Sequence, residues 1–169
     1  MTLPYQRLYK ALHYQFKDEK LLKLALTHRS VSGNHNNERL EFLGDSILGM
    51  LVAEYLYQHF PQEKEGRLTR LRATLVKQDS LAEIARHLQL GDYLLLGAGE
   101  LKSGGFRRDS ILADTVEAIL GAIFLDSGQI SQCRDCLIAW YDQRLQALTS
   151  ETFLKDPKSR LQEYLQAQR

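Results

Sequence analysis

The sequence has few cysteines, no long apolar run and almost no net charge, and each absence narrows the class of protein. Its two cysteines, Cys133 and Cys136, form a single C-x-x-C, and neither a second pair nor histidines at zinc spacing accompany them. We therefore expect reduced thiols in a cytoplasmic protein. No run of about 18 apolar residues is present, so no membrane span is expected, and the N-terminus lacks the layout of a secretion signal.

The charges nearly balance, because 22 Lys and Arg residues are matched by 21 Asp and Glu residues, which leaves a net charge of +1. This balance alone does not predict a polyanionic partner. The basic residues are nevertheless clustered, and they form one group of Arg67, Arg70, Arg72 and Lys77 and another of Lys102, Arg107 and Arg108. Either cluster could bind phosphates, and either could be an ordinary solvated surface.

Apolar residues recur at helical spacing and no convincing alternating strand is present, which predicts an all-α fold. We expect helices over residues 5–12, 20–26, 37–57, 111–125 and 131–148, with two more between Gly66 and Gly91. Asp18, Asp79 or Ser80, and Asp109 or Ser110 are the expected N-caps. Asp126, Ser127 and Gly128 are expected to end the helix over 111–125. Residues 94–105 are rich in glycine without the spacing of a phosphate-binding loop, and we expect them to be irregular.

The composition changes near residue 148, which predicts one domain over residues 1–148 and a linker over 149–155. Asp156 and Pro157 then have the pattern of the N-cap and first residue of a new helix over 156–169. Its apolar stripe finds no partner within its own segment. We therefore expect the first element of a second module.

Two of the expected helices are apolar almost all round, yet each has acids on one face, namely Glu38, Glu41 and Asp45 on the first and Asp114 and Glu117 on the second. Gly121, one turn further along the second helix, is expected to leave room beside them. Buried carboxylates are costly unless a cation neutralises them. An all-oxygen set suits Mg²⁺ or Mn²⁺, but ion pairs with arginines such as Arg39 would also serve, and the spacing leaves both interpretations open.

Other catalytic chemistries fit this pattern less well. A di-iron bundle needs Glu-x-x-His pairs, and no histidine follows these acids at that spacing. No serine or cysteine lies in a recognisable nucleophile turn. Carboxylates that hold Mg²⁺ fit phosphoryl transfer, in which the metal activates water and offsets the charge of the transition state.

Both acidic segments, NERLEFLGDS (37–46) and SGGFRRDSILADTVEAILGAIFLDSG (103–128), resemble signature segments of ribonuclease III. ALTHRS (25–30), EGRLTRLRATLV (65–76) and LGAGELKSGG (96–105) also resemble segments of that family, in the same order. The resemblance covers nearly all of residues 5–148. DPKSRLQEYLQ (156–166) resembles the opening helix of the family's double-stranded-RNA-binding domain.

The resemblance implies the all-helical ribonuclease III endonuclease fold and a homodimer whose signature helices pack across the dimer axis. It implies an endoribonuclease that cuts both strands of double-stranded RNA, in rRNA and mRNA processing. The implied products have 5′-phosphates, 3′-hydroxyls and short 3′ overhangs, and the implied cofactor is Mg²⁺ or Mn²⁺. The alternative is a non-catalytic RNA-binding or dimerisation module, as in family members that have lost the acids.

Position by position, the resemblance assigns metal binding to Glu41, Asp45, Asp114 and Glu117. Asp45 and Glu117 are expected to be the most directly catalytic of these. Glu38 and Glu65 match secondary acids that family members place near the RNA or the neighbouring site.

The remaining assignments concern RNA and the partner subunit. Phe42 matches an aromatic residue that inserts into the partner subunit, although core packing would also explain it. Duplex RNA is read mainly through its shape, 2′-hydroxyls and phosphates. The expected RNA contacts are therefore basic residues: Arg67, Arg70, Lys102, Arg107 and Arg108. His28 is expected to be a structural hydrogen-bonding residue.

Overall fold

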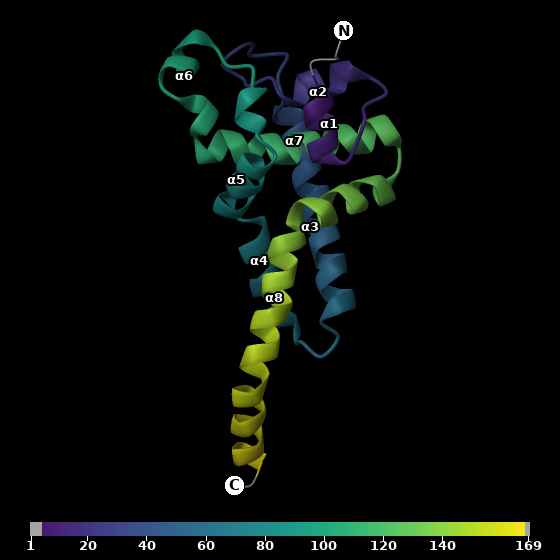
Figure 1. The fold of residues 1–169 in the computed structure, drawn as a ribbon, viewed down its shortest axis with the longest axis vertical. Coiled ribbons are helices and arrows are strands. Elements are labelled where there is room, and N and C mark those ends of the chain that lie inside the picture. Colours follow the sequence, from purple (N-terminus) through teal and green to yellow (C-terminus); the bar gives the residue numbers. More distant parts are fainter. Residues whose placement is uncertain (1–4, 168–169) are drawn as a thin grey trace.

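The structure is a computed structural model that describes the backbone of residues 5–167 and the side chains of residues 5–148 (Figure 1). Its helices are α1 (Gln6–Leu12), α2 (Glu19–Ala25), α3 (Glu38–His59), α4 (Glu65–Val76), α5 (Gln78–His87), α6 (Ala98–Lys102), α7 (Asp109–Ser127) and α8 (Ile130–Ala167), with 3-10 turns η1 (Leu90–Asp92) and η2 (Gly105–Arg107). Within the described residues the only β pairing is one bridge between Thr27 and Leu95. The predicted all-α fold is confirmed. None of the described helices has the length and hydropathy needed to cross a bilayer.

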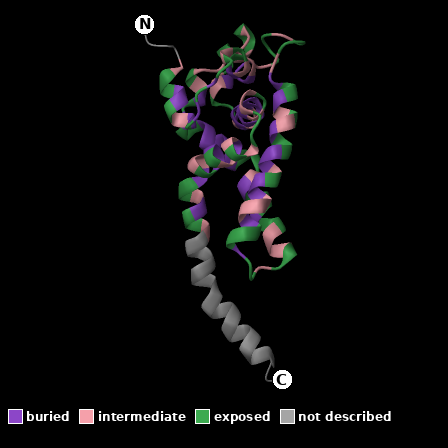
Figure 2. Ribbon diagram, turned by 90° about the vertical axis from the view of Figure 1, so that its right-hand side faces the viewer, coloured by how far each residue is buried: buried purple, intermediate pink, exposed green. Residues whose placement is uncertain are grey.

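Helix α7 is the centre of the domain, and α2, α3, α5 and α8 pack around it (Figure 1). Its residues Ala118, Ile119 and Leu120 are fully buried, as are Ala122 and Ile123 one turn later. Such all-round burial explains why the sequence of α7 is apolar almost without a break. Figure 2 shows the buried residues gathered where the packed helices meet.

Two glycines allow α3 and α7 to cross with their backbones in contact. A Cβ atom on Gly44 would collide with the carbonyl oxygen of Glu117, and a Cβ atom on Gly121 would collide with the carbonyl oxygen of Leu40. The predicted room beside Gly121 is therefore filled by the α3 backbone. This close crossing places the acids of the two helices side by side.

The observed helix ends agree with the predicted ones in some places and differ from them in others. Asp18 accepts a hydrogen bond from the Lys20 N–H at 3.0 Å, and Gly128 ends α7 with a φ of 66°, both as predicted. The predicted caps of α5 and α7 are wrong, because Lys77 and Arg108 hold the N-cap positions without side-chain hydrogen bonds. Asp109 lies inside the first turn of α7 and pairs with Arg86 instead.

Two further segments differ from expectation. Part of the glycine-rich stretch, Ala98–Lys102, is the short helix α6. Helix α8 continues through residues 149–155 and past Asp156, so the expected helix break and N-cap are wrong. Residues 149–155 contain neither glycine nor proline, which are the strongest helix breakers. The side chains of 156–169 lie outside the described residues, and the RNA-binding-domain assignment stays a prediction.

Asp126, near the end of α7, fastens the N-terminal segment to the core. Its carboxylate accepts hydrogen bonds from the Tyr14 hydroxyl at 2.6 Å and from the N–H groups of Lys17 and Asp18 at 2.9 Å each. Burial opposes ionisation, but these hydrogen bonds outweigh it and lower the pKa of Asp126. Sequence reasoning had treated this residue only as part of the helix stop.

Candidate metal centre and active site

Three of the four predicted metal ligands converge where α3 crosses α7. Glu41 of α3 and Asp114 and Glu117 of α7 each place one carboxylate oxygen within 4.8 Å of the others. All three residues are partly buried. The arrangement follows from the backbone contact at Gly44 and Gly121, which leaves little space between the two acidic faces.

Asp45, the fourth predicted ligand, lies one turn after Glu41 and is exposed. It is outside the group of three, but its carboxylate lies close enough to accept a hydrogen bond from Glu117 when Glu117 is protonated. The structure therefore places Asp45 beside the cluster and on its solvent side.

The cluster has an excess of negative charge. Burial, followed by the charges of Asp45, Asp114 and Glu41, raises the pKa of Glu117 to about 8. Burial is also the main cause that raises the pKa values of Glu41 and Asp114. Among the described residues none of these three acids forms an ion pair, and Arg39 forms none with them. An all-oxygen cluster with uncompensated charge fits a hard divalent cation such as Mg²⁺.

Comparison with known proteins identifies the family to which the chain belongs. The family model described as ribonuclease-III-like matches residues 18–144. Curated proteins named ribonuclease 3 from a Marinomonas species and from Aliivibrio fischeri are each 61% identical to the chain over 169 residues, which is 100% of this chain. The chain belongs to the ribonuclease III family.

The aligned region is 74% of the Marinomonas protein and 75% of the Aliivibrio protein. The nuclease domain of ribonuclease III from Campylobacter jejuni has a TM-score of 0.80 and 44% identity, over 82% of this chain and 96% of that domain. Dicer from Pichia stipitis has a TM-score of 0.66 and 30% identity, over 80% of this chain and 60% of Dicer. As a member of the ribonuclease III family, the chain is an endoribonuclease of double-stranded RNA.

The two secondary acids predicted from the ribonuclease III resemblance lie in different places. Glu38 lies 3.5 Å from Arg29 in an ion pair whose side chains are both more than half exposed. Its charge contributes to the raised pKa values of Glu41 and Asp114. Glu65 lies on α4, where it accepts a hydrogen bond from the Thr69 hydroxyl at 2.6 Å, and it is not part of the cluster.

Asn37 is a site residue to which the sequence reasoning gave no role beyond opening the signature segment. It is 3% exposed, and its Nδ2 donates to the carbonyl oxygen of Ala25 at 3.1 Å while its N–H donates to that of Thr27 at 2.9 Å. These bonds fix the start of α3, and so the position of Glu41, against the segment that precedes it. The available signal was a polar residue directly before an apolar helix.

The two basic clusters differ in whether their side chains form ion pairs with other residues. On α4, Arg70 and Arg72 are exposed and Arg67 is partly exposed, and these three form no ion pair with any described residue. In the second cluster Arg108 pairs with Glu100 and donates to the Ser103 hydroxyl at 3.2 Å. The Arg107 guanidinium lies 4.8 Å from the centre of the Phe106 ring, and Lys102 is exposed.

One side of α3 is apolar and exposed in the single chain. Phe42 is 79% exposed, Tyr57 is 75% exposed and Met50 lies between them on the same side. Helix α3 is therefore not buried all round as predicted, because only its other side, which includes Leu48 and Leu51, packs against the core. The exposure of Phe42 rules out core packing as its role within one chain.

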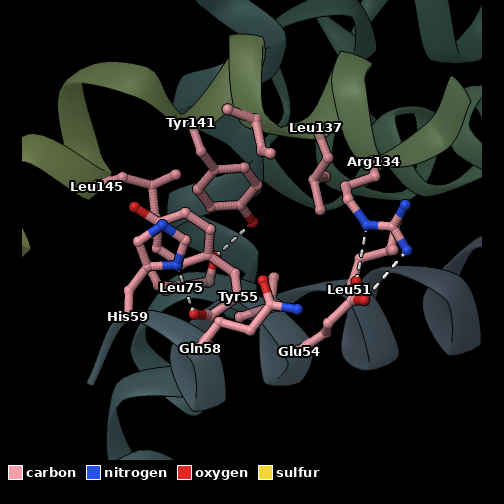
Figure 3. Close-up of a pocket in the computed structure, with 12 residues that line it drawn as sticks. Leu51, Glu54, Tyr55, Gln58, His59, Leu75, Arg134, Leu137, Tyr141 and Leu145 are labelled. Carbon is pink, nitrogen blue, oxygen red and sulfur yellow. Dashed lines mark hydrogen bonds and ion pairs between the residues drawn. The ribbon is translucent and has the colours of Figure 1, made fainter. Parts of the chain in front are cut away.

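A separate hollow lies between α3 and α8, and none of its lining residues belongs to the acidic cluster (Figure 3). At one end Arg134 donates to Glu54, and at the other the ring of His59 stacks on that of Tyr55 with centres 3.9 Å apart. Tyr141 of α8 donates to the carbonyl oxygen of Leu75 at 2.7 Å, which ties α8 to the end of α4.

Proposed function

We propose that this chain hydrolyses both strands of double-stranded RNA in a Mg²⁺-dependent reaction, with Mn²⁺ as a substitute. The observation that carries the proposal is the cluster of Glu41, Asp114 and Glu117, whose oxygens converge and which forms no ion pair with any described residue. Glu41, Asp45, Asp114 and Glu117 would hold the cation. A bound divalent cation supplies an activated water and offsets charge on the phosphoryl group that is attacked.

The residues of the cluster have different parts in this proposal. Glu117 is protonated at neutral pH because of its raised pKa, so it must give up a proton as it becomes a ligand. Asp45 is exposed beside it. We assign the directly catalytic roles to Asp45 and Glu117, as the resemblance to ribonuclease III implies. Glu38 and Glu65 remain secondary acids near the RNA. The proposed products have 5′-phosphates, 3′-hydroxyls and short 3′ overhangs.

We propose that Arg67, Arg70, Lys102 and Arg107 contact RNA phosphates. Arg67 and Arg70 form no ion pair with described residues. Lys102, the last residue of α6, and Arg107, in the turn η2, are exposed. Arg108 contacts Glu100 and Ser103, so its first effect is to hold the loop that presents its neighbours. Phosphate contacts of this kind predict binding that weakens as salt increases.

We propose a homodimer that forms through the exposed apolar side of α3, with Phe42 inserted into the partner subunit. A large exposed apolar face is typical of an interface. In the nuclease domain from Campylobacter jejuni a region is involved in dimer formation. The Phe42→Asp variant should sediment as a monomer at micromolar concentration, whereas Leu101→Asp, a change at an exposed leucine on α6, should not. A wild-type monomer under these conditions would contradict the dimer.

We propose that residues 1–148 form the endonuclease domain, that 149–155 connect it to the next module and that 156–169 begin a double-stranded-RNA-binding domain. The family match over residues 18–144 supports the first boundary. We further propose that the enzyme acts on rRNA and mRNA precursors in the cytoplasm. Its two buried free cysteines are consistent with a reducing compartment.

The decisive experiment is cleavage of an end-labelled RNA duplex by the Glu117→Gln variant in Mg²⁺. The rate should fall by about a hundredfold or more, as for loss of a group that stabilises the transition state. Glu54→Gln, which removes another partly buried acid of α3 outside the cluster, should cleave at nearly the wild-type rate. If Glu117→Gln also cleaved at that rate, the site assignment would be wrong. If the wild type bound duplex without cleaving it in Mg²⁺ or Mn²⁺, the non-catalytic alternative would be favoured.

A further inference from the structure

His28 has a side chain whose hydrogen-bonding state is fixed by its neighbours. The backbone N–H of Ser30 donates to the Nδ1 atom of His28 at 3.2 Å. A backbone N–H can only donate, so Nδ1 must present a lone pair. In the neutral ring the proton is therefore on Nε2.

A second donor supports the same assignment. The Oγ atom of Ser30 lies 2.8 Å from Nδ1 of His28 and accepts a hydrogen bond from the Gly97 N–H at 2.9 Å. Since Nδ1 presents a lone pair, the hydroxyl of Ser30 donates its own proton to Nδ1, and its lone pairs remain able to accept from Gly97. Two donors thus face one nitrogen of His28.

Other histidines in the structure have the opposite arrangement. Nδ1 of His59 lies 2.9 Å from the carbonyl oxygen of Tyr55, and Nδ1 of His87 lies 3.2 Å from that of Glu83. A carbonyl oxygen can only accept, so these two rings have their proton on Nδ1 when neutral. His28 is distinguished from them because it turns an N–H, and not a lone pair, outward at Nε2.

The backbone around His28 is held on both sides. Its N–H donates to the carbonyl oxygen of Leu95 at 3.0 Å, and its own carbonyl oxygen accepts from the Val31 N–H at 2.9 Å. Gly97 approaches so closely that a Cβ atom there would collide with the carbonyl oxygen of Ser30. The ring is therefore presented from a rigid turn, and Nε2 forms no hydrogen bond with any residue in the described part of the chain.

This turn lies at the edge of the acidic cluster. The carbonyl oxygen of Thr27 accepts from the N–H of Asn37 at the start of α3, and Arg29 pairs with Glu38. The His28 ring lies near enough to Asp114 to interact electrostatically with that carboxylate, and this interaction opposes the rise in the pKa of Asp114 that burial causes. His28 is only partly buried, so its Nε2 is open to a substrate on the solvent side.

We propose that His28 donates its Nε2–H to a non-bridging oxygen of an RNA phosphate bound at the acidic cluster. This inference rests on the proposed function, since it needs RNA at that site. A carboxylate cluster repels phosphates, and an N–H donor at its edge offers them a partner without competing as a metal ligand, because Nε2 already carries a proton. His28 would thus be a substrate-contacting residue, in place of the purely structural role expected from the sequence.

The first test compares two substitutions, each of which keeps a hydrogen-bonding group at the position of one imidazole nitrogen. The Asn side chain of His28→Asn keeps an acceptor near the Nδ1 position and lacks the outer donor. The amide nitrogen of His28→Gln reaches the Nε2 position and keeps a donor there. His28→Asn should weaken duplex affinity by about 10- to 100-fold, as expected for loss of a hydrogen bond to a charged group, and His28→Gln should recover part of it.

The second test locates the acceptor. The duplexes contain one methylphosphonate linkage with a 2′-deoxy sugar, moved through the cleavage region, and controls contain the deoxy sugar alone. Binding is measured to the Glu117→Gln protein with and without His28→Asn. At the contacted phosphate the methylphosphonate should erase the effect of His28→Asn, while at other positions the full effect should remain.

These outcomes separate the inference from the proposed function. An equal loss on every duplex would mean that His28 only supports the fold, and no loss on any duplex would exclude the contact; either result overturns the proposal. The comparison is a ratio between substrates within one variant, so it does not depend on the folded fraction. Failure of the proposed function would instead be seen as cleavage by Glu117→Gln itself.

Discussion

Helix α3 holds acids in two regions, and the regions treat negative charge in opposite ways. In its first turns Glu41 meets Asp114 and Glu117 of α7, and these three acids form no ion pair with any described residue. Three turns later Glu54 accepts two hydrogen bonds from Arg134, at 2.8 Å from Nε and 3.1 Å from Nη2. One helix thus presents an uncompensated cluster and a compensated pair.

The difference separates an acid that serves folding from the acids that are proposed to serve chemistry. The Glu54–Arg134 pair closes one end of the hollow between α3 and α8 and joins the two helices. The cluster around Glu117 instead opposes folding. Burial and like charges raise the pKa of Glu117, and each ionised acid of the cluster adds repulsion. A charge that the protein leaves unpaired at a cost in stability is available to a cation and, through it, to a substrate.

The largest effect should come from disrupting the backbone contact between α3 and α7 that brings the acids of the cluster together. Gly44→Ala would place a Cβ atom against the carbonyl oxygen of Glu117, so α3 and α7 must separate. We expect a loss of about 3 kcal/mol or more in the free energy of unfolding, at or above the upper end of the usual range for overpacking, and loss of cleavage. Urea denaturation and the duplex assay measure both quantities.

Gly99→Ala on α6 is the matched control, since a Cβ atom there meets nothing within 4 Å. It should leave stability unchanged or raise it by about 0.5 to 1 kcal/mol, the gain from replacing glycine by alanine in a helix. Equal stability losses in the two variants would show that the helix crossing does not depend on Gly44.

The next effect concerns pH. Glu117 has an ordinary pKa of 4.5 in the unfolded chain and about 8 in the folded chain, so the folded protein binds more protons between these values. Stability of the metal-free protein should therefore fall as pH rises from about 4.5 to 8, by about 3 kcal/mol if partial exposure is allowed for. Glu117→Gln should flatten this slope in thermal melts with EDTA. A slope unchanged by the substitution would place the responsible group elsewhere.

Adding Mg²⁺ should reverse that penalty. A cation that binds only the folded state stabilises it by about 2.7 kcal/mol at a hundred times its dissociation constant. Thermal melts at pH 8 should show this increase for the wild type and for Glu54→Gln, but not for Asp114→Asn. An increase of the same size in Asp114→Asn would mean that Mg²⁺ binds outside the cluster.

The smallest effect should come from the compensated pair. Both side chains are about one third exposed, with 36% for Arg134 and 33% for Glu54, so water solvates either partner when the other is removed. Glu54→Gln should cost about 0.5 to 1 kcal/mol, as for other partly exposed ion pairs. A loss as large as that of Gly44→Ala would contradict the distinction between the two regions.

Much of the fold could be predicted from local patterns. Apolar periodicity located the long helices, and Asp18 and Gly128 marked their ends through interactions within a few residues. The predicted cap of α7 was wrong because Asp109 is engaged by Arg86, which is 23 residues away in the sequence. A contact of that range leaves no local pattern.

The same limit applies to the site. Spacing on two helices was enough to nominate Glu41, Asp114 and Glu117, because a helix places i and i+3 on one face. It could not show that Asn37 anchors the start of α3 or that Ser30 and Gly97 fix the ring of His28. Those roles depend on segments that meet only in the folded chain.

The backbone contact between α3 and α7 has a consequence for how the enzyme tolerates change. At Gly44 and Gly121 main-chain atoms of one helix meet those of the other, so this contact sets the distance between the two helices at the proposed metal site. Side chains elsewhere in the core can vary in size and alter stability without altering that distance. The distance between the acids of α3 and α7 should therefore change little when core residues are substituted. The absence of a Cβ atom at Gly44 and at Gly121 determines that distance.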